Sequence, residues 1–165
     1  MAFELDSRIN PALVGLAWLI GHWEGTGYGH QPAGEAEQFT VTVDFSENGA
    51  DYLHYIMQWF ATDDHGRPLR ALGMETGFWR PTGDQEVEVV IAHPQGVAEV
   101  YLGRIEGAKI ELRTDLVART ANAVVPVTGG HRLYGNVESD LMFAYDRGTA
   151  DSQIEPHIWA RLARA

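Results

Sequence analysis

Short runs in which polar and apolar residues alternate, each ended by turn-forming residues, fill most of the sequence after its N-terminal segment. In Glu86–Ala92, glutamates alternate with valine and isoleucine, and Gln38–Phe45 alternates in the same way. A period of two residues is typical of a β-strand with one buried face. On this basis ten strands are predicted: Trp23–Gly27, Gln38–Phe45, Tyr52–Ala61, Arg70–Arg80, Glu86–Ala92, Val97–Ile105, Lys109–Val117, Gly130–Tyr134, Glu138–Tyr145 and Ile154–Leu162.

The connections between these runs are mostly short and rich in glycine, asparagine and aspartate. Glu47-Asn48-Gly49, Tyr134-Gly135-Asn136 and Asp146-Arg147-Gly148 are read as tight turns. Because consecutive strands joined by tight turns pair in an antiparallel manner, the sequence predicts an all-β, ten-stranded antiparallel up-and-down barrel. A β-sandwich is the rival fold, but it needs longer crossovers. Arg119–Gly130 is the one long connection, and 165 residues suit a single domain over residues 1–165.

A short helix is predicted before the first strand. Asn10 can cap it, Pro11 fits its first position, and Gly21 ends it. Four apolar residues fall on one face of such a helix: Leu13, Leu16, Ala17 and Ile20.

The composition excludes several classes of function. The net charge of −11, from 23 acidic and 12 basic residues, argues against nucleic acid or an anionic membrane as a partner. The absence of cysteine excludes disulfides, thiolate metal sites and a cysteine nucleophile. No run reaches the roughly 20 apolar residues of a membrane span. The N-terminus lacks the basic region and cleavage site of a signal peptide, so a cytoplasmic location is expected.

Five tryptophans, six tyrosines and six phenylalanines are available to the interior of the barrel. They can line a cavity for one small ligand or simply fill the core, and composition favours neither reading. The glycine-rich stretch Gly21–Gly29 enters a strand and is not followed by a helix, so it is not a phosphate-binding loop. Its alternate glycines are expected to let the first strand bend and pack closely, with Trp23 plugging one end of the barrel.

The seven histidines are the natural candidates for chemistry. No pair has the helical spacing of a zinc site, and no serine has the setting of a nucleophile elbow. His65 and His93 are expected in solvated turns, and His54 could be a satisfied interior residue.

His157, in the last predicted strand, is the remaining candidate. Strict alternation groups it with Glu155, Trp159 and Arg161, without showing which face is interior. The ordinary reading is a barrel-wall histidine satisfied by a hydrogen bond. The functional reading is an imidazole that faces an apolar cavity, as single-point ligation of haem iron requires.

Several stretches, in order along nearly the whole chain, resemble the nitrobindin family. Gly21, Trp23, Gly25 and Gly27 match a GxWxGxG motif, and Pro156–Leu162 is similar to the closing His-Leu-x-x-x-Leu-like segment of the family. Three internal stretches also resemble family segments: GRPLRALGMETGFWRP, AHPQGVAEVYLG and Thr120–Val124. Each match is weak alone, whereas the ordered set is fairly specific.

The resemblance implies a ten-stranded barrel, shaped like fatty-acid-binding proteins, that holds ferric haem b, Fe(III). It implies that His157 is the axial iron ligand and the catalytic residue of a haem-dependent peroxynitrite isomerase, which converts peroxynitrite to nitrate. Nitric oxide is expected to bind the same iron. The actinobacterial branch of the family looks closest.

Some positions depart from the family pattern. Ala33 and Asn122 stand at two cofactor-binding positions where the family often has threonine and lysine. Arg70 stands where the family has a histidine two places after its proline, and the glutamate of that strand comes late, at Glu75.

An alternative function is a non-catalytic carrier of a fatty acid or another small apolar ligand. It needs an interior cation for a carboxylate, and the candidates are Arg161, Arg132 and Arg80. A third reading is a barrel with a filled interior that binds neither ligand. Self-association into a homodimer is a further expectation.

Overall fold

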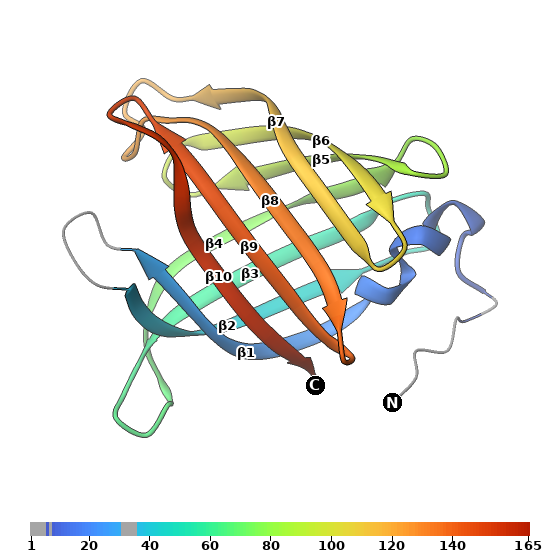
Figure 1. The fold of residues 1–165 in the computed structure, drawn as a ribbon, viewed down its shortest axis with the longest axis horizontal. Helices are drawn as coiled ribbons and strands as arrows, with labels where there is room; N and C mark the ends of the chain where they lie inside the picture. The colour runs from blue at the N-terminus through green and yellow to red at the C-terminus, as the bar shows by residue number, and fades with distance from the viewer. Residues whose placement is uncertain (1–5, 7, 31–35) are drawn as a thin grey trace.

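The computed structural model describes residue 6 and residues 8–30 and 36–165, and these form a closed antiparallel barrel (Figure 1). Each strand pairs with its neighbours in sequence, and β1 pairs with β10 to close the barrel. The predicted barrel is therefore confirmed and the sandwich is not. The strands are β1 (Gly21–His30), β2 (Ala36–Ser46), β3 (Leu53–Thr62), β4 (Pro68–Pro81), β5 (Glu86–His93), β6 (Val97–Glu106), β7 (Lys109–Arg119), β8 (Val127–Val137), β9 (Asp140–Thr149) and β10 (Ser152–Arg164).

Two of the predicted turns lie inside strands. Tyr134-Gly135-Asn136 belongs to β8, and the turn that follows is made by Glu138 and Ser139, whose φ angles are 53° and 71°. Asp146-Arg147-Gly148 belongs to β9. A Cβ at Gly148 would lie 3.1 Å from the side chain of Ile154, so this glycine allows close strand packing and does not form a turn.

The predicted helix is present as a 3₁₀ helix, η1 (Pro11–Leu19), and the side chain of Asn10 caps it by accepting a hydrogen bond from the Ala12 amide at 3.0 Å. A 3₁₀ helix has three residues per turn, so residues three apart lie in one line. Leu13, Leu16 and Leu19 are accordingly fully buried, and Ala17 is buried as predicted. Ile20, which an α-helical period places on the buried face, is partly exposed instead.

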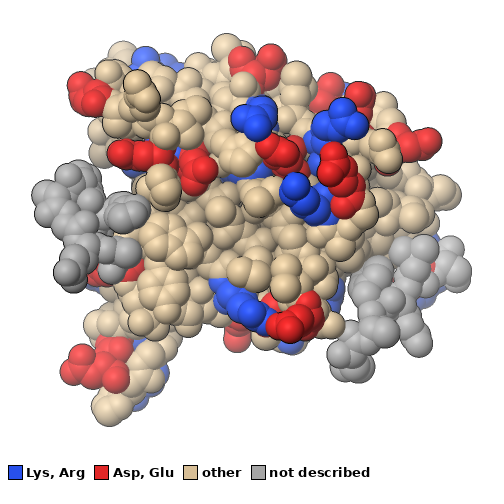
Figure 2. Space-filling view, in the orientation of Figure 1, with Lys and Arg blue, Asp and Glu red and all other residues tan. Residues whose placement is uncertain are grey.

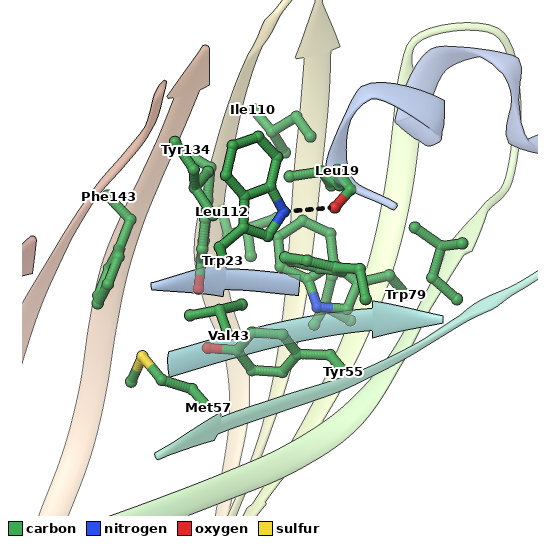
Figure 3. Packing of buried hydrophobic residues seen from close by; sticks show 14 of the residues in the cluster. Leu19, Trp23, Val43, Tyr55, Met57, Trp79, Ile110, Leu112, Tyr134 and Phe143 are labelled. Atoms are coloured by element: carbon green, nitrogen blue, oxygen red, sulfur yellow. Dashed lines mark hydrogen bonds between the residues drawn. The ribbon is translucent and has the colours of Figure 1, made fainter. Parts of the chain in front are cut away.

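Helix η1 closes one end of the barrel, which we call the plugged end (Figures 1 and 3). Trp23 is fully buried there, as predicted, and its indole N–H donates to the Leu19 carbonyl at 2.8 Å. The Trp79 ring packs edge-on against Tyr134 and Phe45, with centroid distances of 4.9 and 5.2 Å. Apolar and aromatic side chains thus fill this end.

Gly25 shows why the first strand is rich in glycine. A Cβ at this position would meet the backbone of β10, with the Cα of Leu162 at 2.7 Å. The close approach of β1 and β10 at the seam of the barrel therefore needs glycine, as the sequence predicted.

The outer surface that faces the viewer in Figure 2 is largely uncharged in the middle, over β9 and β10, and carries charged side chains around that area. Tyr28 of β1 and Trp159 of β10 are paired across the seam of the barrel, and their rings stack with centroids 6.2 Å apart. Self-association through such a face stays a prediction. No helix in the described part of the chain is long and apolar enough to cross a bilayer.

Candidate functional site

A cavity of about 310 Å³ opens at the end of the barrel opposite η1, which we call the cavity end. Its volume falls within the range of small-molecule pockets, roughly 300–1,000 Å³. The interior is therefore filled at one end and hollow at the other. The lining residues come from nearly every strand and from two connections: Gly29, Glu37, Phe39, Trp59, Leu72, Glu75, His93, Gln95, Val97, Val124, Val125, Val127, Tyr145, Arg147, His157 and Ile158.

A β-bulge in β10 turns His157 into this cavity. Pro156 pairs with Asp146 of β9 and Ile158 pairs with Tyr145, so His157 is an extra residue without a direct partner in the register. Such a bulge lets two successive residues face the same side of a sheet. His157 and Ile158 both line the cavity. Strict alternation, which grouped His157 with the outward-facing Trp159, is wrong at this position for that reason.

The His157 imidazole has no hydrogen-bond or ion-pair partner within the described ranges. Its ring lies edge-on to the Tyr145 ring, with centroids 5.4 Å apart. Burial, together with the positive charges of Arg147 and Arg132, lowers the pKa of His157 to about 3. The ring is therefore uncharged at neutral pH, and the hydrogen bond expected of an ordinary wall histidine is not found among these residues.

Beneath the cavity, Arg132 of β8 is fully buried between two carboxylates from other strands. Its guanidinium binds both carboxylate oxygens of Glu75 in β4, and one of these contacts, from Nη2 to Oε2, is 3.1 Å long. The same Nη2 lies 3.4 Å from Oε1 of Glu99 in β6. A two-pronged arginine–carboxylate pair of this kind is a strong and well-oriented interaction.

His93 joins this cluster from the end of β5. Its Nε2 contacts Oε1 of Glu99, and its Nδ1 lies 3.6 Å from Oε2 of Glu75. The side chain is only 13% exposed, so the expectation that His93 lies in a solvated turn is wrong. Val89 and Ile91 point inward, and strand alternation places His93 on the same face. This alternation was the sequence signal that His93 is buried.

Four tyrosine hydroxyls complete the cluster. Tyr55 donates to Oε1 of Glu75 at 2.7 Å, and Tyr101 and Tyr145 donate to Glu99. The Tyr134 hydroxyl lies 3.4 Å from Nη1 of Arg132. We call the full set the ionic floor: Glu75, Glu99, Arg132, His93, Tyr55, Tyr101, Tyr134 and Tyr145.

The charges of the ionic floor stabilise one another. Burial by itself would raise the pKa of Glu75, but the Arg132 guanidinium outweighs it and holds this pKa below its ordinary value. Burial likewise opposes ionisation of Glu99, yet the hydrogen bond from His93 and the charge of Arg132 lower its pKa to about 2. Both carboxylates are thus ionised at neutral pH, and the pKa of Arg132 is raised well above normal by the same contacts despite its burial.

The ionic floor separates the two ends of the barrel. Tyr55 and Tyr134 reach it from the aromatic cluster around Trp79. Glu75, His93 and Tyr145 line the cavity from the other side. Its polar groups are therefore fixed by one another and form the bottom of the cavity.

Arg147 of β9 is a site residue that the sequence reading missed, because it was assigned to a turn. Within β9 it shares the inward face with Phe143 and Tyr145, and it lines the cavity beside His157. Extension of the alternation from Phe143 would have revealed it. It forms no hydrogen bond or ion pair with any residue in the described part of the chain.

The three arginines proposed to hold a carboxylate are engaged elsewhere. Arg161 lies on the outer face and binds Asp140 at 2.6 Å and Glu138 at 3.1 Å. Arg80, also outside, binds Glu88 at 2.8 Å. Arg132 points inward, but the carboxylates of the chain itself already occupy it.

The long connection from 120 to 126 forms part of the cavity wall. It is held against the turn between β5 and β6, where the Thr120 and Val124 amides donate to the carbonyls of Gly96 and Gln95 at 2.9 and 3.1 Å. Val124 and Val125 line the cavity, whereas Asn122 is exposed and does not.

Residues 12–164 match the model of the THAP4-like, heme-binding beta-barrel domain. The chain belongs to this haem-binding family. It is 53% identical to the "Ferric nitrobindin-like protein" of Cutibacterium acnes, with all of both chains covered, and 41% identical to the "Peroxynitrite isomerase" of a Nocardioides species, with 99% of each covered. Its fold is similar to that of Rv2717c from M. tuberculosis, with a TM-score of 0.82, 30% identity and coverage of 95% of this chain and 99% of the other.

The haem-binding family motif GxWxGxG lies in β1, where Gly21, Gly25 and Gly27 flank the buried Trp23. It shapes the barrel at the plugged end and along the seam, and Gly21, Trp23, Gly25 and Gly27 do not line the cavity. Ala33 lies outside the described residues.

The internal strand that carries the late glutamate of the family pattern contains two bulges. In β4 the register against β3 shifts twice, which leaves Leu69 and Leu72 as extra residues. Beyond these bulges Glu75 points inward together with the buried Gly77 and Trp79. Arg70, at the position of the family histidine, is exposed, and Leu72 lines the cavity.

The donor set suits the haem of this family better than a bare metal ion. No three histidine or carboxylate side chains of the described residues are grouped to hold a metal ion by themselves. The uncharged imidazole of His157, which is not engaged by the ionic floor, projects into a cavity whose walls are largely apolar, and this is the arrangement that an iron porphyrin requires. The residues present therefore fit haem.

Proposed function

We propose that this barrel binds haem b in its ferric state through an imidazole nitrogen of His157, and that the loaded protein isomerises peroxynitrite to nitrate. The observation that carries the proposal is the uncharged imidazole that the bulge in β10 turns into the cavity, with no hydrogen-bond partner among the described residues. The names of relatives support it. Proteins 41% and 38% identical to this chain, from Nocardioides and Salinispora tropica, are named "Peroxynitrite isomerase", and the word "Ferric" in the name of the Cutibacterium acnes relative supports the oxidation state.

Bound haem would supply a Lewis-acidic iron able to bind an anion or nitric oxide and to promote rearrangement of an O–O bond. The protein provides the conditions for this chemistry. His157 stays uncharged and keeps a nitrogen lone pair available, because burial disfavours its protonated form. The cavity walls are largely apolar. The isomerisation itself needs no further reactant, since peroxynitrite and nitrate have the same atoms and charge.

A titration of the purified protein with hemin tests the assignment. We expect the wild-type protein to give a Soret band typical of histidine-ligated ferric haem, and His157→Ala to lose it. His54→Ala is the matched control, because His54 lies on the outer face and bonds to Thr76 at 2.9 Å. Equal spectra from the wild-type and His157→Ala proteins would show that the ligand assignment is wrong. Stopped-flow decay of peroxynitrite, with nitrate and nitrite yields, then tests the activity.

The alternative of a non-catalytic carrier has one observation in its favour. Arg147 places a positive charge, unpaired among the described residues, in a largely apolar cavity, as the carboxylate of a fatty acid would require. Native mass spectrometry of protein purified without added cofactor separates the two functions. A porphyrin mass supports haem binding, whereas a co-purified lipid supports the carrier.

A further inference from the structure

Arg147 is placed on the same wall of the cavity as His157. On β9 it is two residues from Tyr145, which faces Ile158 of β10 across the strand pair. The bulge inserts His157 between this pair and the pair formed by Arg147 and Glu155. Both Arg147 and His157 line the cavity, and the positive charge of Arg147 disfavours protonation of His157.

Among the contacts of the described residues, the guanidinium of Arg147 has no anionic partner, in contrast to Arg132 and Arg161. Arg132 is neutralised by Glu75 and Glu99, and Arg161 by Asp140 and Glu138. Glu155, the cross-strand neighbour of Arg147, forms no ion pair with it among the contacts of the described residues. Cations withdrawn from water are normally paired, since an unpaired one is costly. The open position at Arg147 therefore suits an anion that comes from outside the chain.

We propose that Arg147 is an anion-binding residue of the cavity, and that its guanidinium pairs with an oxyanion of whatever molecule occupies the site. The planar guanidinium fork matches a carboxylate or another planar oxyanion with two parallel hydrogen bonds. Two sources share this chemistry: a propionate carboxylate of the haem, and a small oxyanion that enters beside the iron. The haem arm of this inference rests on the function proposed above.

The location of Arg147 gives the pairing a defined role. An anion held there lies on the His157 side of the cavity and not on the exposed loop at Asn122. A propionate in this place would fix the rotation of the porphyrin about the His157–iron axis. A small oxyanion in this place would be concentrated close to the metal.

The test compares Arg147→Gln with Arg147→Lys, which keeps the charge, and with Arg161→Gln as the control on the outer face. Each protein is titrated with hemin and with hemin dimethyl ester, whose propionates are blocked, and circular dichroism verifies the fold. If the oxyanion is a propionate, Arg147→Gln weakens hemin binding about tenfold, as for the loss of one charge-assisted pair. Binding of the ester is then unchanged, and Arg147→Lys recovers part of the loss.

The second arm measures the binding of nitrite, a small planar oxyanion, to the hemin-loaded proteins by its spectral shift. Unchanged hemin affinity with about tenfold weaker nitrite binding in Arg147→Gln identifies the small oxyanion as the partner. If wild-type protein binds no hemin, the proposed function fails, and the anion assignment is then judged with the apoprotein. The wild-type apoprotein should bind dodecanoate more tightly than dodecanol, whereas the Arg147→Gln apoprotein should bind the two equally. An Arg147→Gln protein that matches wild type with hemin, nitrite and dodecanoate overturns the inference.

Discussion

The two ends of this barrel are built from the same ten strands and yet have opposite interiors. At the plugged end, the leucines of η1 and the rings of Trp23 and Trp79 are fully buried and pack together. At the cavity end, about 310 Å³ is left open, and the lining includes His157 and Arg147, which have no partner among the described residues. The plugged end therefore contributes apolar burial to stability, whereas the cavity end presents the imidazole of His157 and the guanidinium of Arg147 to an incoming ligand.

The ionic floor that divides the two ends should give the largest effect when it is broken. Arg132→Met leaves Glu75 and Glu99 buried without their cation, which is expected to destabilise the fold by about 3–5 kcal/mol. Urea unfolding at pH 7 measures the loss. Burial then raises the pKa of both carboxylates, so this variant should gain stability on acidification from pH 7 to 5, and Glu75→Gln added to it should restore part of the loss. Equal stability of Arg132→Met and wild type would show that the floor is not held by charge.

Matched leucine truncations at the two ends test the comparison directly. Leu16→Ala removes a fully buried side chain of η1 and should cost about 2–5 kcal/mol. Leu72→Ala removes a partly exposed side chain that already borders the cavity, so about 1 kcal/mol is expected. Thermal and urea unfolding of the apoproteins measure both values, and similar losses would mean that the two ends are equally well packed.

The pH dependence of the apoprotein should reveal the uncharged state of His157. The unfolded chain binds a proton at this histidine near its ordinary pKa of 6.5, whereas the folded barrel binds it only near 3. Between these values the unfolded state holds more protons, so acidification favours unfolding by at most about 1.4 kcal/mol per pH unit. His157→Gln should flatten this slope between pH 6.5 and 4.5.

A histidine on the outer face supplies the control for this measurement. His22 lies between Glu24 and Asp44, and their hydrogen bonds raise its pKa. Its contribution has the opposite sign: it is present at acidic pH and is lost as the pH rises through the raised pKa. His22→Gln should therefore leave the acid-side slope of wild type in place, and a loss of that slope in His22→Gln would contradict the assignment to His157.

The smallest effect is expected on the outer surface. Arg161→Gln breaks ion pairs with Asp140 and Glu138, but the Arg161 side chain is 49% exposed. Water and salt screen such pairs, so the loss of stability should be below about 1 kcal/mol. Urea unfolding at low and high ionic strength tests this, and a loss comparable to that of Arg132→Met would remove the distinction between floor and surface.

The sequence predicted the barrel because alternation and turn residues are local signals, and each strand carries its own. It also singled out His157 as the candidate ligand. It did not reveal which way His157 points, because one extra residue in β10 breaks the alternation there. Arg147 was missed for a related reason. The segment Asp146-Arg147-Gly148 has the composition of a tight turn, although it lies in strand β9.

The sequence could not predict that the residues of the ionic floor meet, for a different reason. Glu75, Glu99 and Arg132 lie on three separate strands. Arg132 is 57 positions from Glu75 and 33 positions from Glu99 in the sequence. Each of them follows the inward alternation of its strand, so an inward-facing charge was a readable signal in each case. Their mutual satisfaction depends on the curvature of the closed barrel, which no single strand encodes.

The position of the ionic floor also sets how deep a guest molecule can go. A flat, disc-like guest needs width near the mouth and little depth, and the layer of fixed charges does not obstruct it. A long acyl chain would have to stop at this layer or fold back, because passage would separate Arg132 from its carboxylates. The barrel should therefore select its contents by shape, and binding should decline as straight-chain guests are lengthened.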